Sequence, residues 1–142
     1  IRDKPVTGVQ TCALPICRDF EIEGRVARGE ARGKSIGFPT ANIPLGAYLR
    51  PALGVYAVRA AIEQENGEIW LDGVANIGVR PTFGSDGVVL EVFLFDFDDD
   101  LYGKRLRVRL VDFLRPEKKF DGVDDLKAQI AQDSAKAQKI LQ

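Results

Sequence analysis

Alternating apolar and polar residues predict two half-buried strands, over residues 20–28 and 104–114. Two further strand-like runs, residues 54–64 and 68–77, are separated by Glu65-Asn66-Gly67. An Asn-Gly pair between apolar runs is a strong hairpin signal, because both residues accept the positive φ of a tight turn. We therefore expect the two runs to pair antiparallel.

Residues 75–83 are expected to end this hairpin in a loop, because Gly78 and Pro81 interrupt regular pairing. Asn76 offers a side-chain amide within the loop. Two interpretations of this stretch stay open, a plain connection and a contact with substrate.

Residues 88–95 form an apolar run that contains a single charge, Glu91. Because successive side chains of a strand point to opposite faces, Glu91 should share a face with Val89, Phe93 and Phe95. A carboxylate on such a face costs free energy unless it reaches water, pairs with a cation or serves a function. Glu91 is therefore a candidate general base, and a structural ion pair or a position at a barrel mouth is the alternative.

Apolar residues recur near every 3.6 positions over residues 123–141 and predict a C-terminal helix. Asp121 can cap it, and Asp124 near its start and Lys139 near its end suit the helix dipole. About five or six strands with hairpin connections and one terminal helix predict a mainly β fold, a small closed antiparallel barrel.

Residues 29–42 predict a shaped loop, because Pro39 removes a backbone donor and excludes both helix interior and central strand. The glycines of this stretch lie four residues apart around a Lys-Ser pair, as Gly29, Gly33, Lys34, Ser35 and Gly37. That composition is expected where backbone amides approach a phosphate. Thr40 and Asn42 lie two apart, so in an extended chain both oxygens face one ligand. We interpret the stretch as a nucleotide-phosphate and metal loop, and a surface loop without a ligand is the alternative.

The P-loop pattern does not fit this stretch. It needs four residues between its first glycine and Gly-Lys-Ser/Thr, whereas Gly29 and Gly33 enclose three. Pro39 and Pro44 also follow too closely for a helix to begin there. A Walker-type NTPase is not expected.

Length and charge narrow the class of protein. The 142 residues suit one domain, and 20 basic against 21 acidic residues leave no excess charge to attract nucleic acid or anionic lipid. No apolar run suits a membrane span and no signal peptide is recognisable, so we expect a cytoplasmic protein that binds small molecules.

The chain contains no histidine, which excludes histidine acid/base catalysis and histidine metal ligation. Cys12 and Cys17 have no second pair to complete a zinc site. Residues 1–17 show neither strand nor helix periodicity, so we expect a non-native or disordered extension there and a domain over residues 18–142.

Six blocks of sequence carry a resemblance to a known family. In order they are Gly37-Phe38-Pro39-Thr40-Ala41-Asn42, Gly54-Val55-Tyr56, Ala75-Asn76-Ile77-Gly78 with Arg80-Pro81-Thr82-Phe83, Leu90-Glu91-Val92 with Phe95-Asp96-Phe97, Asp100-Leu101-Tyr102-Gly103, and Arg115-Pro116-Glu117-Lys118-Lys119-Phe120. In order and spacing the blocks resemble the bacterial riboflavin kinases, over about residues 20–141. In bacteria this module is typically the C-terminal half of a bifunctional riboflavin kinase/FAD synthetase.

The resemblance implies a six-stranded Greek-key barrel and transfer of the ATP γ-phosphoryl group to the ribityl 5′-hydroxyl of riboflavin, giving FMN and ADP. It implies that Glu91 is the catalytic base and that Thr40 and Asn42 hold Mg²⁺ and ATP, with the glycine loop and Lys34 on the phosphates. The flavin is then expected against the loop 115–120, with candidate contacts at Arg115, Lys119 and Phe120. A solvated charge run remains the alternative for the lysines of that loop.

Two other functions remain open. A flavin- or nucleotide-binding barrel without kinase activity would not need Glu91 and Thr40 together. A barrel that binds RNA would need basic residues interleaved with exposed aromatic residues, a pattern not evident in the sequence. The adenylyltransferase motif of the bifunctional family bears histidine, so FAD synthesis is not expected on this chain, and an adenylyltransferase half is expected to be missing from its N-terminal side.

Overall fold

The computed structural model describes residues 20–27, 39–45, 52–65, 67–79, 87–97 and 99–142. These residues form six strands and a C-terminal helix: β1 (Glu21–Arg25), β2 (Ala41–Pro44), β3 (Gly54–Gln64), β4 (Gly67–Val79), β5 (Val88–Leu94), β6 (Arg105–Arg115) and α2 (Val123–Leu141). No helix in this part of the chain is long and apolar enough to cross a membrane.

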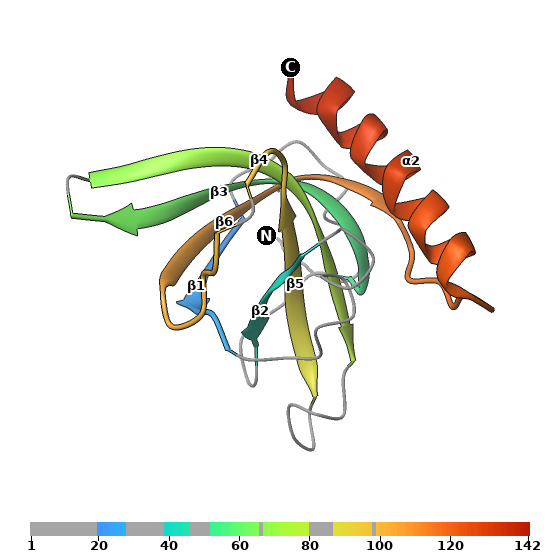
Figure 1. Ribbon diagram of the computed structural model, residues 1–142, viewed down its shortest axis with the longest axis horizontal. Helices are drawn as coiled ribbons and strands as arrows, with labels where there is room; N and C mark the ends of the chain where they lie inside the picture. Colours follow the sequence, from blue (N-terminus) through green and yellow to red (C-terminus); the bar gives the residue numbers. More distant parts are fainter. Residues whose placement is uncertain (1–19, 28–38, 46–51, 66, 80–86, 98) are drawn as a thin grey trace.

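The six strands form one antiparallel sheet in the order β1-β6-β3-β4-β5-β2 (Figure 1). Strands β3, β4 and β5 follow one another as neighbours, and β6 returns to lie beside β3, which is a Greek-key arrangement. The two ends of the sheet meet where Ala27 bridges to Asn42, with the Ala27 N–H donating to the Asn42 carbonyl at 2.7 Å. The sheet is thus a nearly closed barrel, and the predicted fold class is confirmed.

The long hairpin of β3 and β4 confirms the prediction made from the Asn-Gly pair. Its register runs from Gln64 opposite Gly67 to Gly54 opposite Ile77. The prediction that a loop begins at residue 75 is wrong, because β4 continues to Val79 and pairs with β5 as far as its end. Gly78 does not interrupt the ladder, since its backbone pairs opposite Val89 and needs no side chain to do so.

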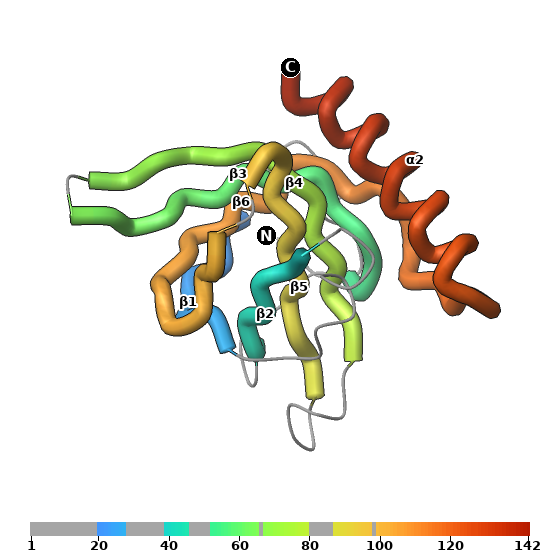
Figure 2. The backbone as a smooth tube through the Cα atoms, viewed as in Figure 1, coloured from blue at the N-terminus to red at the C-terminus, as the bar shows by residue number. Residues whose placement is uncertain are grey.

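Apolar side chains fill the barrel and a second, smaller cluster covers part of its outside. The interior includes fully buried side chains from all six strands, among them Ile22, Ile43, Val58, Ile77, Leu90 and Val108. The outer cluster lies between the sheet and α2 and comprises Val55, Ala57, Val74, Leu114, Ala137 and Leu141, with Phe93, Phe95 and Val111 packed against it. Figure 2 shows α2 running along the outside of the barrel.

The predicted helix is confirmed, but its capping residue is not Asp121. Gly122 occupies the N-cap position with an extended backbone, and no side chain caps the helix there. Asp124 and Asp125 lie in the first turn and Lys139 in the last, as the dipole favours.

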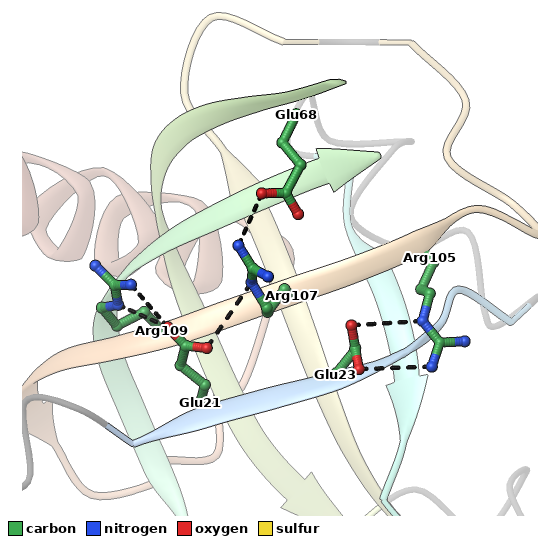
Figure 3. A network of polar contacts seen from close by, with 6 residues as sticks. All are labelled: Glu21, Glu23, Glu68, Arg105, Arg107 and Arg109. Carbon is green, nitrogen blue, oxygen red and sulfur yellow. Dashed lines mark hydrogen bonds and ion pairs between the residues drawn. The ribbon is translucent and has the colours of Figure 1, made fainter. Parts of the chain in front are cut away.

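The outer face of β1, β6 and β4 carries a ladder of opposite charges (Figure 3). Arg109 pairs with Glu21 at 2.8 Å, and Arg107 pairs with Glu68 at 2.8 Å. The Trp70 ring lies beneath both guanidinium groups, with ring-centre distances of 5.3 Å to Arg107 and 4.9 Å to Arg109. Because acidic partners neutralise these arginines, the face does not present the basic surface that RNA binding requires.

Candidate functional site

Three polar side chains lie side by side across neighbouring strands. Glu91 on β5 is directly opposite Asn42 on β2 and directly opposite Asn76 on β4. Directly paired residues of antiparallel strands point to the same face of the sheet, so the three side chains form one row. We call Asn42, Glu91 and Asn76 the polar row.

The polar row lies on the outside of the barrel. The residues that flank its members along each strand belong to the interior core, for example Ala41 and Ile43 on β2. Strand alternation therefore turns the row outward. Glu91 shares this face with Phe93, which packs against the cluster under α2, so the face that the sequence predicted for Glu91 is confirmed.

The side chains beside the row on this face include the apolar Val74 and Phe93, and much of the row is shielded from water. Asn42 is only 7% exposed, and Glu91 and Asn76 are half-buried. One carboxylate oxygen of Glu91, Oε1, is buried. Desolvated carboxylate and amide groups interact more strongly with a bound polar ligand than exposed groups do, because water competes less.

The loop that precedes α2 reaches the polar row through Glu117. The Asn76 side-chain amide donates from Nδ2 to Glu117 Oε1 at 3.1 Å. The two residues are 41 positions apart, and no local pattern in the sequence indicated their contact. The loop predicted to contact the flavin is therefore in direct contact with Asn76 on β4, one member of the polar row.

The predicted flavin-binding residues all lie in this loop or at its start. Arg115 ends β6 and donates from Nε and Nη2 to the Asp133 carboxylate at 2.8–3.2 Å, so much of its guanidinium holds the loop to α2. Phe120 is half-buried, with its ring centre 5.9 Å from the Arg115 guanidinium and 5.6 Å from Lys118 Nζ. Lys119 is exposed. Sequence reasoning did not find the anchoring role of Asp133, because its partner is distant in the chain.

The predicted metal residues lie at the start of β2. Thr40 directly precedes the strand and is half-buried, and Asn42 lies within it beside Glu91. The remaining predicted phosphate-loop residues lie outside the described part of the chain and stay predictions: Gly29, Gly33, Lys34, Ser35 and Gly37.

The oxygen donors at this end of β2 fit magnesium. In the described part of the chain, no three acidic, cysteine or histidine side chains gather as a metal cage. Mg²⁺ does not need such a cage, because it keeps several waters and binds through few protein oxygens together with substrate phosphates. The Thr40 hydroxyl and the Asn42 amide oxygen are hard oxygen donors of the kind it prefers.

The fold and the polar row together define a class of small antiparallel barrels that carry a polar site on the outer face. Within that class, the family model described as flavokinase, riboflavin kinase, matches residues 16–141. The chain belongs to the riboflavin kinase family.

Known proteins similar to the chain include longer ones. The bifunctional riboflavin kinase/FMN adenylyltransferase of Escherichia coli strain K12 is 48% identical over 122 residues, which are 86% of this chain and 38% of that protein. The chain thus spans well under half the length of this curated relative.

Two solved structures are also similar to the chain. A crystal structure from Streptococcus pneumoniae, described as a macrolide-efflux protein, matches with a TM-score of 0.70 and 38% identity, over 80% of this chain and 36% of that one. The riboflavin kinase from Trypanosoma brucei matches with a TM-score of 0.62 and 20% identity, over 85% of this chain and 76% of that one. At that identity the second match shows the fold alone.

Proposed function

We propose that the chain is an ATP:riboflavin 5′-phosphotransferase that forms FMN and ADP. The observation that carries the proposal is the register of the polar row, which sets the Glu91 carboxylate beside the Asn42 amide on a partly desolvated face. Family membership gives the reaction class, and the row supplies the groups that this reaction needs.

Glu91 acts as the general base on the ribityl 5′-hydroxyl. As the hydroxyl oxygen bonds to the γ-phosphorus, its proton passes to the Glu91 carboxylate, and the bond from that phosphorus to the bridging oxygen breaks to release ADP. The chain contains no histidine, so a carboxylate on this face is the natural acceptor for the proton. A positioned base typically contributes about 10²–10⁴-fold to the rate.

Thr40 and Asn42 hold Mg-ATP, and the glycine loop with Lys34 holds the phosphates. When bound, Mg²⁺ neutralises charge on the phosphate oxygens, which is the main requirement of phosphoryl transfer. Asn42 pairs with Glu91 in the β2–β5 ladder and is only 7% exposed, so little of its side chain is left to order when the nucleotide binds.

The flavin lies against the loop 115–120 and the start of α2, where Arg115, Lys119 and Phe120 are its candidate contacts. Arg115 contributes chiefly by holding the loop to Asp133. Phe120 offers a half-buried aromatic face for the isoalloxazine ring.

Incubation of the purified chain with riboflavin and Mg-ATP tests the proposal, with FMN, FAD and ADP separated by chromatography. We expect FMN and ADP in equal amounts and no FAD. Binding of flavin without ADP-coupled formation of FMN would instead indicate a non-catalytic flavin-binding barrel. The bifunctional relatives also carry an adenylyltransferase, and we propose that such a module precedes this domain in a complete protein.

A further inference from the structure

The amide of Asn76 has a fixed orientation. Its nitrogen Nδ2 lies 3.1 Å from Glu117 Oε1. An ionised carboxylate only accepts hydrogen bonds, so the nitrogen must face Glu117 and the oxygen Oδ1 must face away from it. Glu117 thereby selects one of the two ways in which the Asn76 amide could lie.

The oxygen of the Asn76 amide, Oδ1, is buried and needs a hydrogen-bond donor. Asn76 Oδ1 is shielded from solvent and has no hydrogen-bond partner among the residues that the structure describes. Asn76 is paired with Glu91 on β5 at one side and with Val55 on β3 at the other. Neither an ionised carboxylate nor an aliphatic side chain can donate to it. A buried carbonyl without a donor costs free energy, which a bound ligand with a hydroxyl group can recover.

We propose that Asn76 binds a secondary hydroxyl of the ribityl chain of riboflavin and so aligns the terminal hydroxyl on Glu91. This inference rests on the proposed function, because it takes Glu91 as the base for that terminal hydroxyl. Adjacent strands lie about 4.8 Å apart, so two acceptors on paired residues suit hydroxyls on nearby carbons of one polyol chain. Asn76 Oδ1 accepts the hydrogen bond from the polyol, and Glu117 holds that oxygen in its orientation.

Fluorescence titration with two flavins tests the inference independently of turnover. Riboflavin carries the ribityl chain, and lumiflavin has the same ring system with a methyl group in its place. We expect Asn76→Ala to weaken riboflavin binding by about tenfold and to leave lumiflavin binding unchanged, because one hydrogen bond to a buried group is lost. Glu117→Ala, at an exposed position, should weaken riboflavin binding selectively by a smaller factor, because the amide is then free to turn.

Val55→Ala is the matched control, because Val55 flanks Asn76 on the side away from Glu91 and carries no polar group. It should leave the ratio of riboflavin to lumiflavin affinity unchanged. If Asn76→Ala weakens both flavins equally, or lowers turnover while riboflavin affinity stays the same, the hydroxyl contact is refuted. A wild-type chain that binds neither flavin refutes it as well.

Failure of the proposed kinase function gives a different result from failure of the Asn76 contact. A wild-type chain that binds riboflavin more tightly than lumiflavin but forms no FMN refutes the kinase proposal. In that case a selective loss in Asn76→Ala still supports polyol binding at the row, and an unchanged ratio refutes it.

Discussion

Arg115 at the end of β6 and Asp133 in the middle of α2 form a bidentate ion pair. Nη2 lies 2.8 Å from Oδ2 and Nε lies 2.9 Å from Oδ1. Gln129 also donates to the same carboxylate at 3.1 Å. With side-chain exposures of 20% and 6%, the pair is largely buried, and it ties the end of β6, where the loop begins, to the middle of α2.

Arg115→Ala should lower the free energy of unfolding by about 3–5 kcal/mol, because the substitution leaves the Asp133 carboxylate buried without its cation. Denaturant unfolding measures the loss. Arg105→Ala is the control, since the pair of Arg105 with Glu23 is 44% and 47% exposed and should contribute less than about 1 kcal/mol. Equal losses in the two variants would show that burial does not govern the strength of the first pair.

Glu91→Gln should lower turnover by about 10²–10⁴-fold and leave the affinities for flavin and Mg-ATP nearly intact, because the amide keeps the shape of the side chain but cannot take the proton. Steady-state kinetics of FMN formation and separate binding titrations measure the two effects. Glu23→Gln, on the exposed ladder of β1, should leave turnover unchanged. Turnover near that of the wild type in folded Glu91→Gln would make Glu91 a structural ion-pair partner.

Thr40→Ala should reduce turnover and Mg-ATP affinity far more than flavin affinity, because the lost hydroxyl belongs to the proposed metal and phosphate site. Calorimetric titration with Mg-ATP and fluorescence titration with riboflavin separate the two. Ser134→Ala removes a hydroxyl from α2 whose oxygen is buried without a hydrogen-bond partner in the described structure. This control should keep both affinities, and comparable losses of both in Thr40→Ala would point to a defect of folding instead.

Gly73→Ala should destabilise the barrel by about 2–3 kcal/mol, because a methyl group there would collide with the backbone carbonyl of Phe93 and lie 3.1 Å from the Leu94 Cα. Thermal unfolding measures the change. Gly122→Ala is the control, since nothing lies within 4 Å of the added carbon and the backbone there is extended. A Gly73→Ala variant as stable as Gly122→Ala would contradict the close packing of β4 on β5.

Local patterns predicted much of the fold. The Asn-Gly pair fixed the β3–β4 hairpin, and alternation placed Glu91 on the face of Phe93. These features depend on neighbouring residues alone, so a single sequence is sufficient for them. The prediction for the end of β4 is wrong, because the backbone of Gly78 continues the ladder that a glycine is expected to interrupt.

The site was less accessible to sequence reasoning, because its parts meet through long-range pairing. Asn42 and Glu91 are neighbours only because β2 lies beside β5 at one end of the sheet. The contact of Asn76 with Glu117 and the pair of Arg115 with Asp133 likewise join distant segments, and polar residues carry no periodicity that indicates their partners. The roles of Lys34 and its neighbouring glycines stay predictions, since they lie outside the described residues.

The seam of the barrel, where Ala27 bridges to Asn42, is the place where the sheet should open first. Among the described residues, an isolated bridge, in which the Ala27 N–H donates to the Asn42 carbonyl, joins the two ends of the sheet, whereas neighbouring strands elsewhere pair through ladders of several residues. Such a junction separates at lower free energy than a full ladder, so the Ala27 amide hydrogen should exchange with deuterium earlier than those within β3. The same Asn42 carries an amide proposed to hold Mg-ATP, and a ligand bound only to the closed form slows that exchange by mass action. Bound nucleotide would then hold the two ends of the sheet together. Deuterium uptake at the Ala27 amide would measure how much of the site is occupied by nucleotide, without any turnover.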